Sequence, residues 1–84
     1  MTTIKQVTKM VEDEDDAVFV GSVWELKVAY IAYPIWKEDG EFLYDDAWLV
    51  SKKDGKMEWI SGSEEFTDEA VLVWKRNGVE YENS

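Results

Sequence analysis

Carboxylates are the most numerous reactive side chains in this sequence, and several stand in adjacent pairs. Two carboxyl groups held together in a cleft can act as acid, base or nucleophile in glycosidases and aspartic proteases. Examples of such adjacent pairs are Asp45-Asp46, Glu64-Glu65 and Asp68-Glu69. Neighbouring residues of a strand point to opposite faces, so such a pair does not form a dyad by itself. The pairs therefore predict solvated acids in turns and loops, not a catalytic centre.

Nucleophilic and metal chemistry have no better support in the sequence. The chain contains no His and no Cys, which excludes imidazole bases, thiolate nucleophiles, Cys/His zinc sites and disulfides. The serines therefore have no histidine to activate them, and no Gly-x-Ser-x-Gly motif is present. No acidic run has the spacing and central glycine of a calcium loop, and no glycine-rich phosphate loop precedes a helix. We predict a protein that is not an enzyme and has no catalytic residue, metal site or cofactor.

The net charge points instead to recognition through a surface. With 19 acidic and 9 basic residues among 84, the formal net charge is −10. Such a chain is unsuited to binding nucleic acid or an anionic membrane, because both select clusters of Lys and Arg. The run Glu12, Asp13, Glu14, Asp15 and Asp16 predicts either a solvated loop or a patch that binds a basic partner protein. In the second case the protein is an acidic inhibitor, an immunity protein or a nucleic-acid mimic.

The beginning of the chain has the period of a helix. The apolar residues that recur on one helical face are Ile4, Val7, Met10 and Val11. Thr3 and Gln6 fit a capping box at the start. The acidic run opposes the helix dipole at the other end. We therefore expect a helix over residues 3–12.

From residue 17 to residue 82 the apolar period is two, which is typical of strands. We expect a strand at 17–20, a break at Gly21-Ser22, and a long central strand at 23–33 that ends or bulges at Pro34. Hairpin turns are predicted at 38–40, 53–55 and 76–78, where Gly follows Asp or Asn, and a polar helical turn anchored by Phe66 at 61–69. The fold class predicted for residues 1–84 is a single α+β domain, with one N-terminal helix packed on an antiparallel β-meander of five to seven short strands.

Size and aromatic content predict an oligomer. Five Trp, four Tyr and three Phe are many for 84 residues, so some rings should lie at an interface or in a pocket. A chain this short buries only roughly 60–65% of its unfolded surface, which makes a monomer marginal. No segment approaches the ~20 apolar residues of a membrane span, and the start lacks the features of a signal peptide. We expect a cytoplasmic homo-oligomer, since a chain without Cys suits a reducing compartment.

The later part of the chain resembles the small phage anti-defence proteins known as anti-Thoeris sponges. The similarity lies in the strand at 46–50, the turn at 53–56, the segment Trp59-Ile60-Ser61, the acidic pair at 68–69 and the strand at 71–73. The opening helix is also similar. Ala70 stands where the family has a Trp.

This resemblance implies a non-enzymatic oligomer that sequesters a nucleotide-derived signal in the host cytoplasm without cleaving it. It implies that Trp59 and Trp24 stack on a base and that Ser61 contacts the ligand. Stacking of this kind contributes ~1–3 kcal/mol per base. Lys56 and Arg76 would then approach the phosphates. The protein that blocks a basic surface of a partner remains the alternative.

Overall fold

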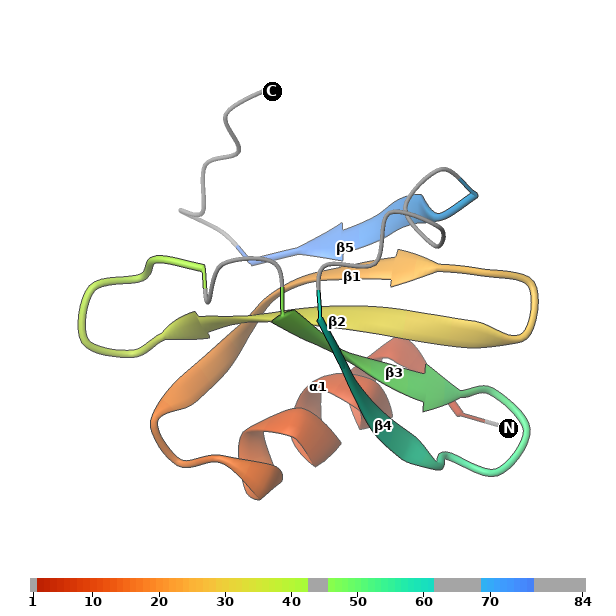
Figure 1. The fold of residues 1–84 in the computed structure, drawn as a ribbon, viewed down its shortest axis with the longest axis horizontal. Coiled ribbons are helices and arrows are strands. Elements are labelled where there is room, and N and C mark those ends of the chain that lie inside the picture. Colours follow the sequence, from red (N-terminus) through yellow and green to blue (C-terminus); the bar gives the residue numbers. More distant parts are fainter. Residues whose placement is uncertain (1, 43–45, 62–68, 77–84) are drawn as a thin grey trace.

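One helix and five antiparallel strands make up the described part of the chain (Figure 1). The computed structural model describes residues 2–42, 46–61 and 69–76, the side chain of Ser61 excepted. The elements are α1 (Ile4–Glu14), β1 (Val18–Glu25), β2 (Ala29–Trp36), β3 (Asp46–Ser51), β4 (Met57–Ser61) and β5 (Val71–Lys75). The strands form one sheet in the order β4-β3-β2-β1-β5, and α1 packs against β1 and β2. The predicted α+β arrangement is confirmed.

The start of α1 is fixed by the predicted capping box. The Thr3 hydroxyl accepts a hydrogen bond from Gln6 N–H at 3.2 Å, and the Gln6 side chain accepts one from Thr3 N–H at 2.9 Å. Each side chain thereby satisfies a backbone donor that has no partner within the helix. Val7 and Val11 follow on the face of α1 that is fully buried.

The end of α1 differs from the prediction, because the helix continues two residues beyond Glu12 to Glu14. Two ion pairs offset the unfavourable charge of the last turn. Lys9 Nζ lies 2.9 Å from Asp13, and Arg76 Nη2 lies 2.7 Å from Glu12. Charge pairing along and beyond the helix therefore keeps part of the acidic run helical.

Between residues 17 and 36 the predicted strand boundaries are wrong. The expected break at Gly21-Ser22 is a β-bulge inside β1, where the register with β2 shifts. The expected long strand at 23–33 turns at 26–28, and Leu26 N–H donates to Ala29 O at 2.8 Å. No Gly, Pro, Asn or Asp occurs there, so the turn carried no local sequence signal.

Pro34 lies inside β2, opposite Val20 and beside the bulge of β1. Lys37 N–H donates to Ala17 O at 3.0 Å. Hydrogen-bonded and non-hydrogen-bonded pairs alternate along an antiparallel ladder. Because Ala17 and Lys37 are a bonded pair, Val20 and Pro34, three positions further along, are a pair without hydrogen bonds between β1 and β2. The nitrogen of Pro34 thus faces the β3 side, where the register of β2 with β3 ends at Ala32. Proline is tolerated because no ladder bond is lost.

Two of the predicted glycine turns are present. Gly40 and Gly55 have φ values of +74° and +72°, a region that favours glycine. The turn at Gly55 joins β3 to β4 as expected, whereas the one at Gly40 leads only to a single bridge between Ile35 and Phe42. Residues 62–68 and 77–84, with the predicted Phe66 anchor and the last hairpin arm, lie outside the described residues.

The two faces of the sheet follow from the register. Residues directly opposite one another lie on the same face, and one such row crosses all five strands. The row is Trp59, Trp48, Ala32, Val23 and Trp74. Its centre lies under α1, in a fully buried cluster made of Val7, Val11, Val20, Val23, Ala32 and Val50. Trp59 on β4 and Trp74 on β5 therefore lie at the two edges of the helix-covered face.

The last strand departs from a simple meander. β1 to β4 follow one another across the sheet, whereas β5 pairs with β1 at the far edge. Within residues 2–42, 46–61 and 69–76, no helix has the length and apolar character needed to cross a membrane.

Asp54 supports the turn between β3 and β4, and this role predicts a pH effect. Its Oδ1 accepts a hydrogen bond from Lys56 N–H at 3.0 Å. That bond, followed by one from the Ser51 side chain, holds the pKa of the carboxyl below its ordinary value. The unfolded state therefore binds a proton more readily than the folded state in mild acid. The contribution to stability is complete above the ordinary aspartate pKa and is lost as the pH falls through the lowered pKa.

We expect urea unfolding of the wild type and of Asp54→Asn to differ most near neutral pH. The difference in free energy of unfolding should stay constant down to about pH 5 and then shrink as the pH falls to about 2. Asn keeps a carbonyl acceptor for Lys56 N–H, so the comparison isolates the charge. A difference that does not change with pH would contradict this role.

Candidate functional site

Acidic side chains gather at one end of the sheet. Five come from the end of α1 and the residues that follow it, and three from the turn after β2. They are Glu12, Asp13, Glu14, Asp15, Asp16, Glu38, Asp39 and Glu41. Both segments lie on the left in Figure 1, at one end of the longest axis. We call this group the acidic end.

Backbone pairing holds the two acidic segments together. Val18 and Trp36 are register partners, and one residue further out Lys37 N–H donates to Ala17 O at 3.0 Å. Each segment is also fixed locally by a carboxylate that accepts a backbone N–H two residues ahead. Asp15 Oδ1 accepts from Ala17 N–H, and Asp39 Oδ1 accepts from Glu41 N–H, both at 2.9 Å. The positions of the charges are therefore set by the fold.

The other carboxylates of the acidic end differ in whether they form ion pairs or hydrogen bonds with other residues. Asp13 pairs with Lys9 on the exposed side of α1. Glu14, Asp16 and Glu38 are exposed and make no side-chain hydrogen bond or ion pair with another described residue. These three are free to meet a cation on a partner.

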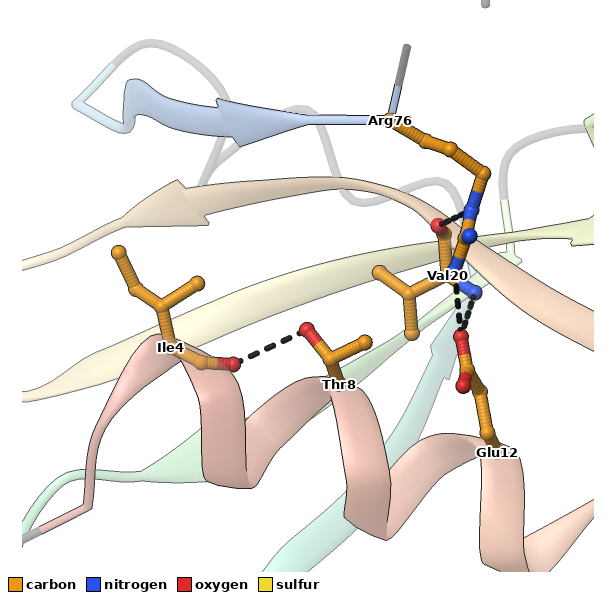
Figure 2. A network of polar contacts seen from close by, with 5 residues as sticks. All are labelled: Ile4, Thr8, Glu12, Val20 and Arg76. Atoms are coloured by element: carbon orange, nitrogen blue, oxygen red, sulfur yellow. Dashed lines mark hydrogen bonds and ion pairs between the residues drawn. The ribbon is translucent and has the colours of Figure 1, made fainter.

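Glu12 is the member of the run that is turned inward (Figure 2). Its side chain is 27% exposed, and Oε2 accepts hydrogen bonds from Val20 N–H at 3.0 Å and Arg76 Nη2 at 2.7 Å. Arg76 Nε donates to Val20 O at 2.9 Å, and Arg76 N–H donates to Gly21 O at 2.9 Å. We call this set of contacts the Arg76–Glu12 clasp.

The clasp replaces a missing strand partner. Because Val20 is not hydrogen-bonded to β2, its N–H and C=O point toward the β5 side of β1. The register of β5 with β1 ends at Ser22 and Lys75, so β5 does not reach Val20. Glu12 takes the N–H and Arg76 takes the C=O, which leaves neither group unpaired at the bulge.

Arg76 is also held by aromatic rings. Its guanidinium carbon lies 4.6 Å from the centroid of Phe19 and 5.7 Å from that of Trp74. With Nε and Nη2 both bonded to the protein, Arg76 joins α1, β1 and the end of β5. Its observed contacts are structural, whereas the resemblance implied a contact with phosphate.

The residues predicted to bind a nucleotide are spread over the molecule. Trp59 lies on β4 on the helix-covered face, 47% exposed, with its ring edge-to-face against Trp48 at 4.9 Å. Trp24 is the register partner of Ile31 and lies on the opposite face. Its Nε1–H donates to the Ser22 hydroxyl at 3.3 Å. These positions do not form one pocket.

The other members of that set are also apart. Lys56 is exposed at the turn that precedes β4, whereas Arg76 follows β5 beside the acidic end. Ser61 ends β4 opposite Asp46. The five residues Trp59, Ser61, Trp24, Lys56 and Arg76 are therefore not brought together.

Lysines gather at the end of the sheet opposite the acidic end. Lys27 lies in the turn between β1 and β2, and Lys52, Lys53 and Lys56 in the turn between β3 and β4. The two turns are joined by Lys52 N–H, which donates to Val28 O at 3.0 Å. We call this the basic end. It lies on the right in Figure 1, and the axis between the two ends is 33 Å long.

A shallow groove of about 560 Å³ runs between α1 and Trp74. Its polar groups are largely occupied: Glu12 belongs to the clasp, and the Thr8 hydroxyl donates to Ile4 O at 3.0 Å (Figure 2). Across the described ranges, no three carboxylates are arranged to hold a metal ion. The acidic end is therefore the most distinctive chemical surface of the described part.

The sequence indicated only part of this surface. The run at 12–16 is a candidate for binding a basic partner from sequence alone, but the sequence pattern places Glu38 and Asp39 only in a turn and Glu41 in the strand after it. These residues lie close to the run at 12–16 because β1 pairs with β2, and no local sequence pattern predicts that pairing. Comparison of the chain with protein-family models, with curated proteins and with solved structures finds no match.

Proposed function

We propose that this protein acts without catalysis, by binding a basic surface of a partner protein through its acidic end. One observation supports this most directly. Eight carboxylates, five from residues 12–16 and three from residues 38–41, lie at one end of a single sheet. Hydrogen bonds hold the backbone of both segments in place, so little backbone entropy is lost when a partner arrives.

The separation of charge favours this use of the surface. A cationic partner is attracted to the acidic end. The four lysines of the basic end, which are partly neutralised by Glu25 and Asp54, offer no such attraction, and this difference orients the encounter and speeds association. The attraction acts over a Debye length, about 8 Å at physiological ionic strength. The exposed Glu14, Asp16 and Glu38 are the side chains that we expect to contact the partner.

Sequestration of a nucleotide-derived signal stays a prediction from the resemblance. The residues it requires lie on different faces and at different ends of the sheet, and a net charge of −10 opposes a phosphorylated ligand. Calorimetry with cyclic and ADP-ribose-type nucleotides tests it. Saturable heat with any of them would favour sequestration over the acidic-end proposal, provided that Trp59→Ala abolishes that heat.

Two matched charge reversals test the acidic-end proposal. Glu14→Lys places a cation in the acidic end, and Glu69→Lys makes the same change just before β5, outside that surface. Both positions are exposed, and each variant changes the net charge from −10 to −8. Each variant and the wild type would be used as bait in a lysate at low salt, and the retained proteins identified.

We expect the wild type and Glu69→Lys to retain the same basic protein, and Glu14→Lys to retain about tenfold less of it. Retention by the wild type should also fall steeply at about 1 M salt, where the Debye length is about 3 Å. Equal retention by the two variants, or retention that is insensitive to salt, would contradict a role for the acidic end.

A further inference from the structure

Trp36 is a large apolar side chain that remains exposed beside the carboxylates of the acidic end. Its exposed fraction is 42%, and it is the last residue of β2, immediately before the acidic turn. Within the described part of the chain, no cation or aromatic ring stacks on its indole. The ring therefore has both apolar area and a π face that a partner can cover.

The strand register places a carboxylate directly beside this ring. Trp36 N–H donates to Glu41 O at 2.9 Å, and the adjoining residues Ile35 and Phe42 form an antiparallel bridge. Trp36 and Glu41 are therefore opposite one another, and their side chains share a face with Cβ atoms about 5 Å apart. On its other side Trp36 is paired with the buried Val18. An indole and a carboxylate thus lie side by side.

Both side chains are free to bind a cation. The Glu41 side chain is exposed and forms no hydrogen bond or ion pair with another residue that the structure describes. Lys37 is the one cation in residues 36–41, and its Nζ lies 4.8 Å from the centroid of Phe19. Phe19 pairs with Ile35, the neighbour of Trp36, and so lies on the opposite face of the sheet. Lys37 therefore does not neutralise Glu41.

We propose that Trp36 and Glu41 form a subsite of the acidic end that binds an arginine side chain of the partner protein. The guanidinium stacks on the indole while its N–H groups donate to the Glu41 carboxylate. A cation–π attraction and charge-assisted hydrogen bonds then act on the same group. This inference rests on the proposed function, because it takes the partner of the acidic end to be a basic protein.

Arginine suits this pair of groups better than lysine does. The guanidinium is planar and weakly hydrated, and its fork of N–H donors lies in the plane that stacks on a ring. It can therefore contact the indole and the carboxylate at the same time. The ammonium group of lysine is a compact and strongly hydrated charge, which gains less from the ring.

The same combination of contacts occurs within the chain. The guanidinium carbon of Arg76 lies 4.6 Å from the centroid of Phe19, and Arg76 Nη2 donates to Glu12 at 2.7 Å (Figure 2). Arg76 is the single arginine of the sequence and is held in the clasp. An arginine at Trp36 must therefore come from another molecule.

The subsite and the surrounding charges should affect different steps of binding. The exposed carboxylates of Glu14, Asp16 and Glu38 act at a distance and raise the association rate. Trp36 acts only after contact, so it should lower the dissociation rate. Trp and Arg are also the residues that most often dominate the affinity of protein interfaces.

Titration of the full chain with octa-arginine and octa-lysine tests the subsite with two probes of equal charge. At low ionic strength we expect octa-arginine to bind about tenfold more tightly than octa-lysine. Trp36→Leu keeps an apolar side chain but removes the π face, and should bring octa-arginine to the affinity of octa-lysine. Glu41→Gln should also reduce the preference. Trp59→Leu, which alters a similarly exposed Trp on β4, should change neither affinity.

Glu14→Lys separates a failure of the subsite from a failure of the proposed function. It should weaken both peptides by the same factor and leave the ratio of their affinities unchanged. Equal affinities for the two peptides, with no effect of Trp36→Leu, would overturn the arginine subsite alone. Absence of binding by either peptide, or binding that Glu14→Lys does not weaken, would contradict the proposed function and the subsite with it.

The indole N–H signals of the five Trp residues give a direct readout by NMR. The signal that disappears in Trp36→Leu identifies Trp36, and the remaining signals show that this variant is folded. We expect octa-arginine to shift the Trp36 signal most and the Trp59 signal little. A titration in which other indole signals move and that of Trp36 does not would overturn the subsite.

Discussion

Arg76→Ala should lower the free energy of unfolding by about 2–3 kcal/mol, because it leaves a half-buried carboxylate and a backbone carbonyl without their partner. Arg76 donates to Glu12 at 2.7 Å and to Val20 O at 2.9 Å, and its guanidinium covers Phe19. For a domain of this size the loss corresponds to a fall in Tm of roughly 10–20 °C. Thermal and urea unfolding followed by tryptophan fluorescence measure both quantities.

Lys9→Ala is the matched control, since it removes a cation from an ion pair on the same helix. Lys9 and Asp13 are 76% and 67% exposed at the side chain, so we expect a loss below about 0.5 kcal/mol. The double variant Arg76→Ala/Glu12→Gln should cost less than the sum of its single changes. Additive effects would show that Arg76 and Glu12 do not act as a pair.

Gly21→Ala should be destabilising by about 1–3 kcal/mol, through overpacking at the bulge. A Cβ at this position would lie 2.6 Å from Ile35 Cγ2 and 2.9 Å from Phe42 Cε1, closer than real atoms approach. Ile35 is 3% exposed, so its methyl group has little room to move. The same unfolding experiments give the change in stability.

Removal of the obstructing side chain provides the control for this prediction. Ile35→Ala alone should cost about 2–4 kcal/mol, because it leaves a cavity. Gly21→Ala in the Ile35→Ala background should cost less than it does in the wild type, since the new methyl group then has space. An equal cost in both backgrounds would show that the steric explanation is wrong.

The sequence was sufficient for the elements with strong local signals. The capping residues Thr3 and Gln6 located the start of α1, and the Asp-Gly sequence at Gly55 located the turn between β3 and β4. The sequence-based prediction was wrong where contacts between distant residues determine the ends of the elements. The end of α1 depends on Arg76, which is 64 residues away from Glu12 in the chain.

The bulge and the strand order show the same limit. Gly21-Ser22 resembles a break, but β1 continues through it because the Arg76–Glu12 clasp satisfies the backbone of Val20. The position of β5 beside β1 likewise depends on long-range pairing. For the candidate site, the sequence alone identified the acidic run at 12–16. That residues 38–41 lie beside it could be seen only in the folded structure.

The central claim is that the acidic end is the surface that binds a partner. Its most direct test is the association rate constant of the retained basic protein with the wild type, Glu14→Lys and Glu69→Lys, measured by stopped flow at low and physiological ionic strength. We expect Glu14→Lys to associate about tenfold more slowly than the wild type at low salt, Glu69→Lys to match the wild type, and the differences to shrink as salt is added. Equal rates for the two variants at every salt concentration would contradict the claim.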